Sequence, residues 1–579
     1  MAAGAERGIW RASAASHRIR AMPKTPLFGL VQRSLRLAQI SRTRGEPLDE
    51  IVDRALQRPD RRNDISRRRF IGITAAASAA IALEGCLPRR RAGSSLPEPR
   101  SDVEPVLVIG AGIAGLTAAY RLRQHGVPVR IIEAQQRVGG RMYSLRSGFA
   151  GGQLCELGGE LIDTGHSHIR ALAAELGIEL DDLREVDAGL DADVWWVGGA
   201  RRSTAEVIEA LAPVAARLSV DRGAWPEGFD PTYRNRGGAE ALDRMTIAAW
   251  LDRAGASGWI RELLDVAFTT EYGMAIDGQS ALNMLTMIQV GAGDLEMYGE
   301  SDERFHVHEG NDLIPLTLAR YLGDAVETGT VLEAVSRSGN GKFTCSLRRG
   351  SSSSDATASH LLLAIPFTTL RNVRLDLPLP EVKRRAIDEL GYGTNAKLMV
   401  GFSERVWRTR YRSNGSVMTS LPFQATWETS RGQAGSAGIL TNFTGGAHAL
   451  DLGRGTAEDQ ARSMVADLDR IYPGAGAAHE GMKSVRFHWP SFPWTLGSYA
   501  GYLPGQWTSI RGAEGEPVGQ LYFAGEHCSL AAQGFMEGGC ETGEEAAKQI
   551  LSSLRIAAVP GGRRGEPRRL MVGAAGSGL

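Results

Sequence analysis

Three glycines at a fixed spacing, Gly110, Gly112 and Gly115, have residue types and positions that could do recognisable chemistry. The first permits a tight turn, the second lets the backbone approach a phosphate, and the third lets a helix pack against a strand. Free N–H groups at the start of such a helix attract a pyrophosphate. Glu133, 23 residues after Gly110, can accept hydrogen bonds from a ribose. The pattern predicts a dinucleotide site that also includes Ile113, Ala114 and Ala134.

The elements around these glycines must hold them in place. The apolar run 106–109 predicts a buried parallel strand, 116–125 predicts a helix that ends at Gly126, and 129–132 predicts a second strand. Strand, helix and strand in this order form a βαβ unit. The motif by itself does not separate NAD from FAD.

A second glycine motif, Gly139-Gly140-Arg141, follows this unit, and the two together resemble the flavin amine oxidase family. The resemblance covers roughly residues 104–555 as a series of blocks in the family's order. It implies that Arg141 supplies charge and hydrogen-bond donors to the phosphates of FAD. The other blocks are Glu156–Leu161, Gly310–Pro315, Val326–Val331, Leu361–Pro366, Leu521–Glu526 and Gly534–Gly539.

The resemblance assigns cofactor contacts to residues far apart in the chain. It implies that Glu526 binds the ribityl or phosphate region, and that a helix over 541–554 points its N-terminus at the flavin ring. A helix dipole there stabilises a reduced, anionic flavin. The further cofactor-binding residues that it implies are Gly140, Gly158, Gly159, Glu160, Leu161, Val331, Gly525, Gly534, Phe535 and Met536.

Lys397 is the candidate catalytic residue. It matches the family lysine that holds a water against the flavin N5, and the apolar residues 398–400 follow it directly. A buried lysine is costly without a function. The alternative is an edge lysine whose ammonium reaches solvent.

Tyr499 and Phe535 fall on the two positions that form an aromatic cage in the family, and Trp494 begins the segment that covers the flavin. Two aromatic faces can orient an amine between them. The alternative is that both rings belong to the core. With Glu160, these three residues are the predicted substrate-binding set.

Departures from the family pattern sharpen the expected chemistry. Ser498 stands where some members carry the cysteine that bonds the flavin, so FAD should be bound non-covalently. Leu161 stands where L-amino-acid oxidases carry the arginine that holds a carboxylate, which favours a plain amine. Glu160 could bind a second, cationic amine, or be a structural carboxylate satisfied by backbone N–H groups.

The resemblance therefore implies an FAD-dependent amine oxidase. Hydride would pass from the amine to the flavin, leaving an imine, and oxygen or another acceptor would take the electrons, oxygen yielding hydrogen peroxide. The alternatives are an L-amino-acid oxidase and, in another class, a non-catalytic secreted FAD-binding protein. Neither a metal site nor a nucleic-acid partner is expected, because there is no C-x-x-C pair and no basic run interleaved with aromatics.

The expected fold class is α/β in two domains, a Rossmann-like FAD-binding domain and a substrate domain of mixed β-sheet and helices. The FAD domain is expected to be discontinuous, over 104–165, 300–340 and 500–555. The substrate domain is expected over 166–299, mostly helical (169–176, 204–218, 246–254 and 260–267), and over 341–499.

The first hundred residues form a distinct leader. They hold 20 Lys and Arg against 9 Asp and Glu, whereas the rest of the chain holds 46 against 57. Ser66–Gly72 resembles a twin-arginine signal, and Ile71–Leu83 is too short to span a membrane. We expect recognition by the twin-arginine export machinery and a periplasmic or extracytoplasmic protein. A lipid anchor at Cys86 is one alternative, and the Gly/Arg/Pro-rich tail 556–579 is expected to be disordered.

Overall fold

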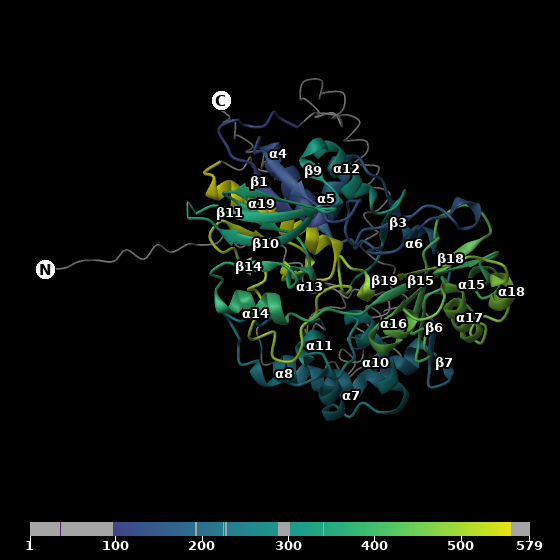
Figure 1. Ribbon diagram of the computed structural model, residues 1–579. Helices are drawn as coiled ribbons and strands as arrows, with labels where there is room; N and C mark the ends of the chain where they lie inside the picture. The colour runs from purple at the N-terminus through teal and green to yellow at the C-terminus, as the bar shows by residue number, and fades with distance from the viewer. Residues whose placement is uncertain are drawn as a thin grey trace, which may run out of the picture.

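The computed structural model describes residues 96–191, 194–223, 225, 229–287, 301–339 and 341–556, together with Leu35 and Leu37. The twin-arginine motif, the apolar run after it, Cys86 and the tail from 557 lie outside the described residues. The fold is the expected mixed α/β type, with three main sheets and helices around them (Figure 1).

A five-stranded parallel sheet forms the layer that carries the glycine motif. Along each strand, neighbouring residues face opposite sides. Val106 and Val108 contribute to one hydrophobic core, whereas Leu107 and Ile109 contribute to another. This burial on both faces explains the uninterrupted apolar strands. In spatial order the strands are β20 (Leu521–Phe523), β13 (Leu361–Leu363), β1 (Val106–Ile109), β2 (Val129–Ile132) and β9 (Val326–Glu327).

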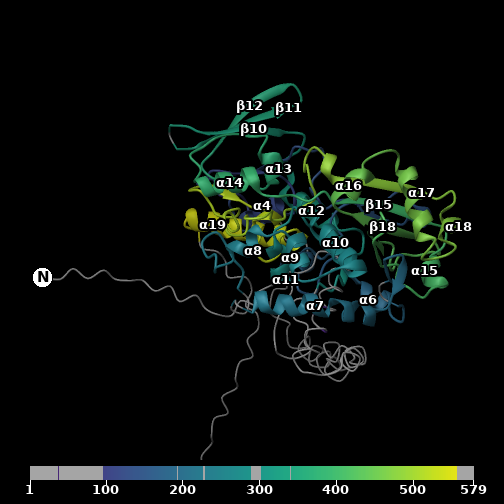
Figure 2. The same ribbon diagram turned by 90° about the horizontal axis from the view of Figure 1, so that it is seen from below.

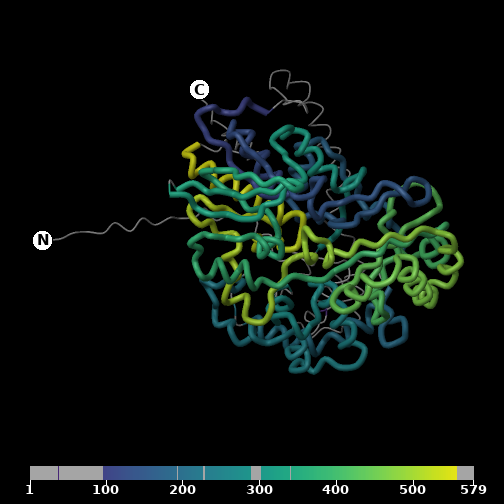
Figure 3. The backbone as a smooth tube through the Cα atoms, in the orientation of Figure 1, coloured from purple at the N-terminus to yellow at the C-terminus, as the bar shows by residue number. Residues whose placement is uncertain are grey.

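Four helices cover one face of this sheet, and the first and last of them cross. The C-terminal helix lies against the helix of the glycine motif, so the two ends of the described chain run side by side (Figure 3). The predicted helices over 116–125 and 541–554 are confirmed, although both begin earlier than expected. The helices are α4 (Ile113–Gln124), α5 (Ser167–Leu176), α12 (Leu313–Leu322) and α19 (Met536–Ser553).

A four-stranded sheet lies on the opposite face, as Figure 2 shows from below. Its strands are β12 (Ser352–Ala358), β11 (Phe343–Arg349), β10 (Val331–Arg337) and β14 (Arg374–Asp376), next to α13 (Phe367–Leu370) and α14 (Glu381–Glu389). Two short strand pairs, β3 (Ser144–Leu145) with β4 (Cys155–Glu156) and β5 (Leu180–Asp182) with β8 (Phe305–Val307), link the layers.

The third sheet has seven strands and is mainly antiparallel. Every residue of β15 and β18 is buried, because helices cover one face and the site lies toward the other. The strands are β19 (Ser484–His488), β15 (Ala396–Phe402), β18 (Gly438–Thr444), β17 (Ala425–Glu428), β16 (Val417–Thr419), β6 (Val194–Val197) and β7 (Ala200–Arg202). The helices beside it are α6 (Leu183–Val186), α15 (Val406–Thr409), α16 (Gly446–Leu452), α17 (Ala457–Leu468) and α18 (Ala475–His479).

A helical layer closes the molecule below the sheets (Figure 1). The longest of these helices begins with a capping box in which Ser203 and Glu206 exchange hydrogen bonds with each other's backbone N–H groups. The four helices expected over 166–299 are all present, with ends shifted by a few residues. The helices are α7 (Thr204–Arg222), α8 (Glu240–Arg244), α9 (Ile247–Arg253), α10 (Gly258–Tyr272) and α11 (Ala281–Met287).

Two elements pack across the expected division between the domains. Strand β13 lies inside the five-stranded sheet, although 341–499 was assigned to the substrate domain. Helix α5 packs on α19 of the FAD-binding layer, although 166–299 was also assigned to the substrate domain. A run of three leucines is equally compatible with a buried strand of either sheet. Its partners depend on the crossover connections that bring parallel strands together, and the run itself does not encode them. The stretch 194–202 forms two strands within the region 166–299 that was expected to be mostly helical.

Among the described residues, no helix has the length and apolar content needed to cross a membrane.

The crossing of α4 and α19 depends on glycines inside a helix. A Cβ at Gly543 would lie 2.4 Å from the backbone oxygen of Ala114, and one at Gly539 would lie 2.7 Å from Ile113 Cγ2. A glycine inside a helix costs about 1 kcal/mol relative to alanine. Close packing of the two helices therefore outweighs helix propensity here.

We expect Gly543→Ala to destabilise the protein by about 1–3 kcal/mol, because the added methyl group overlaps a backbone atom. Denaturant unfolding of the cofactor-free protein, followed by tryptophan fluorescence, measures this. Glu545→Ala, at an exposed position of the same helix, is the matched control. Equal stability of the two variants would contradict the close-approach explanation.

Candidate active site

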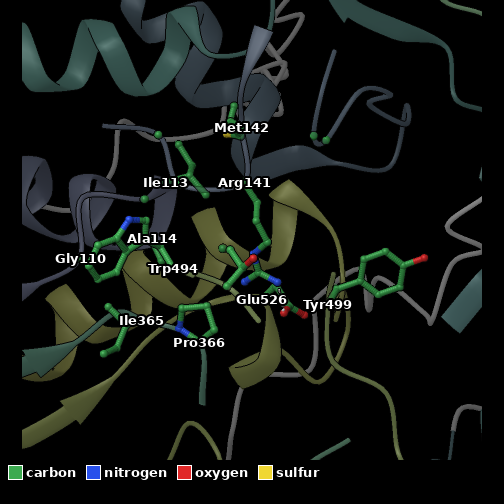
Figure 4. Close-up of a pocket in the computed structure, with 18 of the residues that line it drawn as sticks. Gly110, Ile113, Ala114, Arg141, Met142, Ile365, Pro366, Trp494, Tyr499 and Glu526 are labelled. Atoms are coloured by element: carbon green, nitrogen blue, oxygen red, sulfur yellow. Dashed lines mark hydrogen bonds and ion pairs between the residues drawn. The ribbon is translucent and has the colours of Figure 1, made fainter. Parts of the chain in front are cut away.

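A cavity of about 560 Å³ runs from the glycine motif to the seven-stranded sheet. In Figure 4, Gly110 and Ala114 lie at one side, Tyr499 at the other, and Arg141 and Glu526 between them. All the residues predicted from the sequence to bind cofactor or substrate line this cavity, with Gly115 as the exception. The fold thus brings together segments that are several hundred residues apart in the chain.

The glycine motif forms a cradle that suits a pyrophosphate. A Cβ added at Gly112, the N-cap of α4, would meet no atom within 4 Å, so the open space beside it belongs to the cavity. Gly110 has φ +103°, and a Cβ added there would lie 2.5 Å from Ala364 O. Gly115 faces the turn instead, because its Cβ would lie 2.0 Å from Gly110 O. The first turn of α4 carries no acidic residue, so its N–H groups and dipole remain available for an anion.

Glu133 closes this end of the cavity. Its Oε2 accepts a hydrogen bond from Ala111 N at 2.8 Å, and its Oε1 accepts one from Gln135 N at 2.8 Å. Burial raises the pKa of this carboxyl despite those bonds. Each oxygen keeps a lone pair, so the position also fits a ribose hydroxyl.

Arg141 and Glu526 meet in the middle of the cavity (Figure 4). Arg141 Nη1 donates to Glu526 Oε1 at 2.8 Å and to Ser498 O at 2.7 Å. Glu526 Oε2 accepts from Gly534 N at 2.8 Å. Glu526 thereby anchors Arg141 and the turn before α19. Its negative charge balances that of Arg141, in addition to any direct contact that Glu526 makes with a cofactor.

The segment around Gly158 is held rigidly beside them. A Cβ at Gly158 would lie 1.9 Å from Arg141 O, so the two backbones touch. The fully buried Glu156 carboxylate accepts hydrogen bonds from Ser144 Oγ and Asn311 N and lies 3.0 Å from His306 Nε2. This network fixes where the carbonyl oxygens of the segment point.

Lys397 lies on β15, which is hydrogen-bonded to a strand on each side. The alternative of an edge lysine reaching solvent is therefore wrong, because the residue is only 5% exposed. Its Nζ donates to Gly158 O at 2.8 Å, to Glu156 O at 3.2 Å and to Glu160 Oε2 at 2.7 Å. These are all three of its donors, so a water would have to share or replace one of them.

Glu160 is neutralised by this lysine. Its second oxygen, Oε1, accepts a hydrogen bond from Trp427 Nε1 at 2.9 Å. Burial acts to raise the pKa of the carboxyl, but the Lys397 ammonium and its hydrogen bond outweigh burial, and the pKa lies below its usual value. Because its charge is already paired, Glu160 is poorly suited to hold a second ammonium.

The three predicted aromatic residues line the same cavity. Tyr499 Oη donates to Glu271 O at 2.8 Å, which fixes the ring of Tyr499. The Phe535 ring packs edge-on against the His166 ring at 4.9 Å. Ser498 Oγ donates to Asn395 Oδ1, and none of the four described cysteines lines the cavity.

Several lining residues belong to none of the motifs or predicted site positions described above. Trp427 and Phe443 come from neighbouring strands and place their ring centroids 5.4 Å apart. Asp163, only 1% exposed, follows the Glu156–Leu161 block, and its position two residues beyond the block could have drawn attention to it. Glu303 lies in a separate loop, and the folded chain brings this loop to the cavity. The others include Ser301, Glu333, Arg348, Asn395, Trp489, Pro493 and His527.

Charge is distributed unevenly along the cavity. Among the described lining residues, the arginines are Arg141, in the middle of the cavity, and Arg348, and each is paired with a glutamate. The end opposite the glycine motif holds Lys397 and three carboxyl groups, Glu160, Asp163 and Glu303. That end favours a cationic or neutral amine over a carboxylate.

Replacing Lys397 with Met should lower the free energy of unfolding by about 3–5 kcal/mol, because Glu160 would be left as an uncompensated buried charge. The double variant Lys397→Met/Glu160→Gln should recover much of that loss. Denaturant unfolding of the four proteins in a double-mutant cycle gives the coupling. Additive effects of the two substitutions would show that the pair does not interact.

The same pair predicts a pH dependence. Since the pKa of Glu160 is lower in the folded protein than its ordinary value of 4.5, its contribution is complete above that value. It is lost as the pH falls through the lower, folded pKa. The difference in unfolding free energy between wild type and Glu160→Gln, measured from about pH 6 to pH 3, should therefore shrink with acid. A difference that stays constant over this range would argue against the ion pair.

Comparison with known proteins places this geometry in a family. Over residues 113–551 the chain matches the family described as flavin containing amine oxidoreductase. It is 25% identical to an L-amino acid dehydrogenase of Synechocystis sp., over 77% of this chain and 95% of that protein. It is 24% identical to the flavin-containing amine oxidase B of Bos taurus, over 78% and 86%. Its fold resembles that of cyclohexylamine oxidase from Brevibacterium oxydans, with a TM-score of 0.67, 23% identity, and coverage of 78% and 99%. The glycine cradle, the buried Lys397 and the match over most of its length identify the chain as a member of the flavin-containing amine oxidoreductase family.

Proposed function

We propose that the protein is an FAD-dependent oxidase of amines, which converts a primary or secondary amine to an imine and passes the electrons to oxygen, yielding hydrogen peroxide. The observation that carries the proposal is one cavity that joins a dinucleotide cradle to an aromatic, acid-lined end. When bound, FAD accepts the hydride that leaves the α-carbon of the amine.

The chain's own residues supply position and exclusion of water. Tyr499 is held by its hydroxyl and Phe535 by His166, so both rings present fixed faces to a bound amine. The buried walls strip water from the amine, which favours its neutral, reactive form. Lys397 holds the Gly158 segment in place through its hydrogen bond to Gly158 O.

An amine is favoured over an α-amino acid by the charges at the substrate end. Leu161 lines the cavity where a carboxylate-binding arginine would be needed, and none of the described lining residues at that end is an arginine. A carboxylate there would face Glu160, Asp163 and Glu303 without a partner.

We expect 2-phenylethylamine to be oxidised with a kcat/KM at least about 100-fold above that of phenylalanine, which differs by its carboxylate. A peroxide-coupled assay with the yellow holoenzyme measures both, and anaerobic bleaching of the flavin checks the reductive step. Faster oxidation of amino acids than of amines would favour an L-amino-acid oxidase. Bound FAD that no amine or amino acid reduces would indicate the non-catalytic alternative.

The proposal includes FAD bound without a covalent link. Ser498 cannot form a thioether, and no cysteine is among the described lining residues. Denaturation and filtration of the holoenzyme should release essentially all of the yellow colour into the filtrate. Flavin that stays with the polypeptide on a denaturing gel would contradict this part.

We also propose export by the twin-arginine route, which carries folded proteins and so permits cofactor loading before transport. Replacing Arg67 and Arg68 with Lys should retain the protein in the cytoplasm, whereas the unchanged leader should export it, as fractionation and immunoblotting would show. Cys86→Ala should abolish membrane association if a lipid anchors the protein. Export that is insensitive to the arginine changes would overturn the route.

A further inference from the structure

Asp163 and Glu303 form an acidic wall at the substrate end of the cavity, and no ligand group has yet been assigned to either of them. Asp163 Oδ1 accepts hydrogen bonds from Glu303 N at 2.7 Å and from Ser301 Oγ at 2.8 Å. The two acids therefore lie together, on segments that are 140 residues apart, and both line the cavity.

One oxygen of this wall is buried without a hydrogen bond. Asp163 Oδ2 has no hydrogen-bond partner among the described residues. His166 Nε2 lies 3.3 Å from it, but the two atoms do not form a hydrogen bond, and His166 Nε2 also has no partner among the described residues. His166 Nδ1 accepts from Asp163 N, and burial lowers the pKa of His166 to about 3, so this ring is neutral and cannot balance the carboxylate. Buried polar atoms are rarely left unpaired unless a ligand or water completes them.

Glu303 adds a second carboxyl group, which receives no hydrogen bond from the part of the chain that the structure describes. Its backbone has φ +40°, a left-handed conformation that costs a non-glycine residue on the order of 1 kcal/mol or more. Burial, followed by the proximity of Asp163, raises the pKa of Glu303 well above its ordinary value. Burial likewise raises the pKa of Asp163 to about 7. Among the described residues, the positive charge that acts on Glu303, that of Arg431, does not outweigh burial.

Cations near the wall are committed elsewhere. Lys397 pairs with Glu160, and Arg431 donates to Asp187 and to Glu428 O. His166, the neighbour of Asp163, also contacts the Phe535 ring, which links the wall to the aromatic end of the cavity.

We propose that Asp163 and Glu303 form a subsite for a second ammonium group, so that the preferred substrates are diamines with one amine at the aromatic pair and the other at this wall. The inference rests on the proposed amine oxidase function and names the substrate class of that site. The ammonium would donate to Asp163 Oδ2 and to the Glu303 carboxylate, while the apolar spacer would lie along the aromatic lining. Glu160 takes no part, because its charge is already neutralised by Lys397.

The test compares α,ω-diaminoalkanes with n-alkylamines of the same carbon number, from four to eight carbons, on the purified holoenzyme. We expect kcat/KM to favour the best diamine over its matched monoamine by on the order of 30-fold or more, because a buried charge pair is formed only with the diamine. Asp163→Asn and Glu303→Gln should each remove most of that preference, by lowering kcat/KM far more for the diamine than for its matched monoamine. Asp324→Asn, an exposed acid outside the cavity lining, is the matched control.

Equal loss with both substrate series would show that the acids are structural, and equal rates for diamine and monoamine in the wild type would overturn the subsite. If Asp163→Asn fails to retain FAD, Glu303→Gln alone decides the question. Failure of the proposed function has a different signature, since no amine of either series would then bleach the flavin anaerobically.

Discussion

A single ammonium group, that of Lys397, ties the seven-stranded sheet to the segment beside the glycine cradle. Its three donors reach two backbone carbonyls and the Glu160 carboxylate, all within 3.2 Å. In a buried place each of these bonds is costly to lose, because an uncompensated charge would remain. The position of Gly158 relative to the sheet therefore depends on this group, which acts together with the hydrogen bond from Trp427 to Glu160.

The other end of the site depends on how closely backbones approach one another. Gly115 permits contact with Gly110, Gly158 with Arg141, and Gly543 with α4. A Cβ at any of these glycines would clash with a neighbouring backbone atom. Close packing therefore determines the residue type there, although glycine is unfavourable in a helix or a strand. Two helix N-termini, those of α4 and α19, are thereby brought to the same cavity, where their dipoles favour negative charge on a bound cofactor.

Charge then divides the cavity into two functional halves. The helix N-termini lie at the half that suits phosphates, Arg141 lies in the middle, and Glu160, Asp163 and Glu303 lie at the half that suits amines. The lysine in the acidic half does not alter this division, because Glu160 absorbs its charge. A substrate that carries positive charge is attracted to one half, and a cofactor that carries negative charge to the other, so the two are sorted by electrostatics as well as by shape.

The dinucleotide unit can be read from the sequence alone, because glycine spacing, apolar runs and a helix stop encode it locally. The resemblance to the family added residues from distant blocks, and these also line the cavity. The partners of Lys397 and Glu160, the membership of β13 in the five-stranded sheet, and the meeting of Asp163 with Glu303 became visible only in the folded chain. Each of these joins segments that are far apart in the chain, and no periodicity or spacing records which distant segment supplies the partner. The same physical reason explains why Trp427 and Phe443 had no signal, since buried aromatics on inner strands have the same pattern whether they face a core or a cavity.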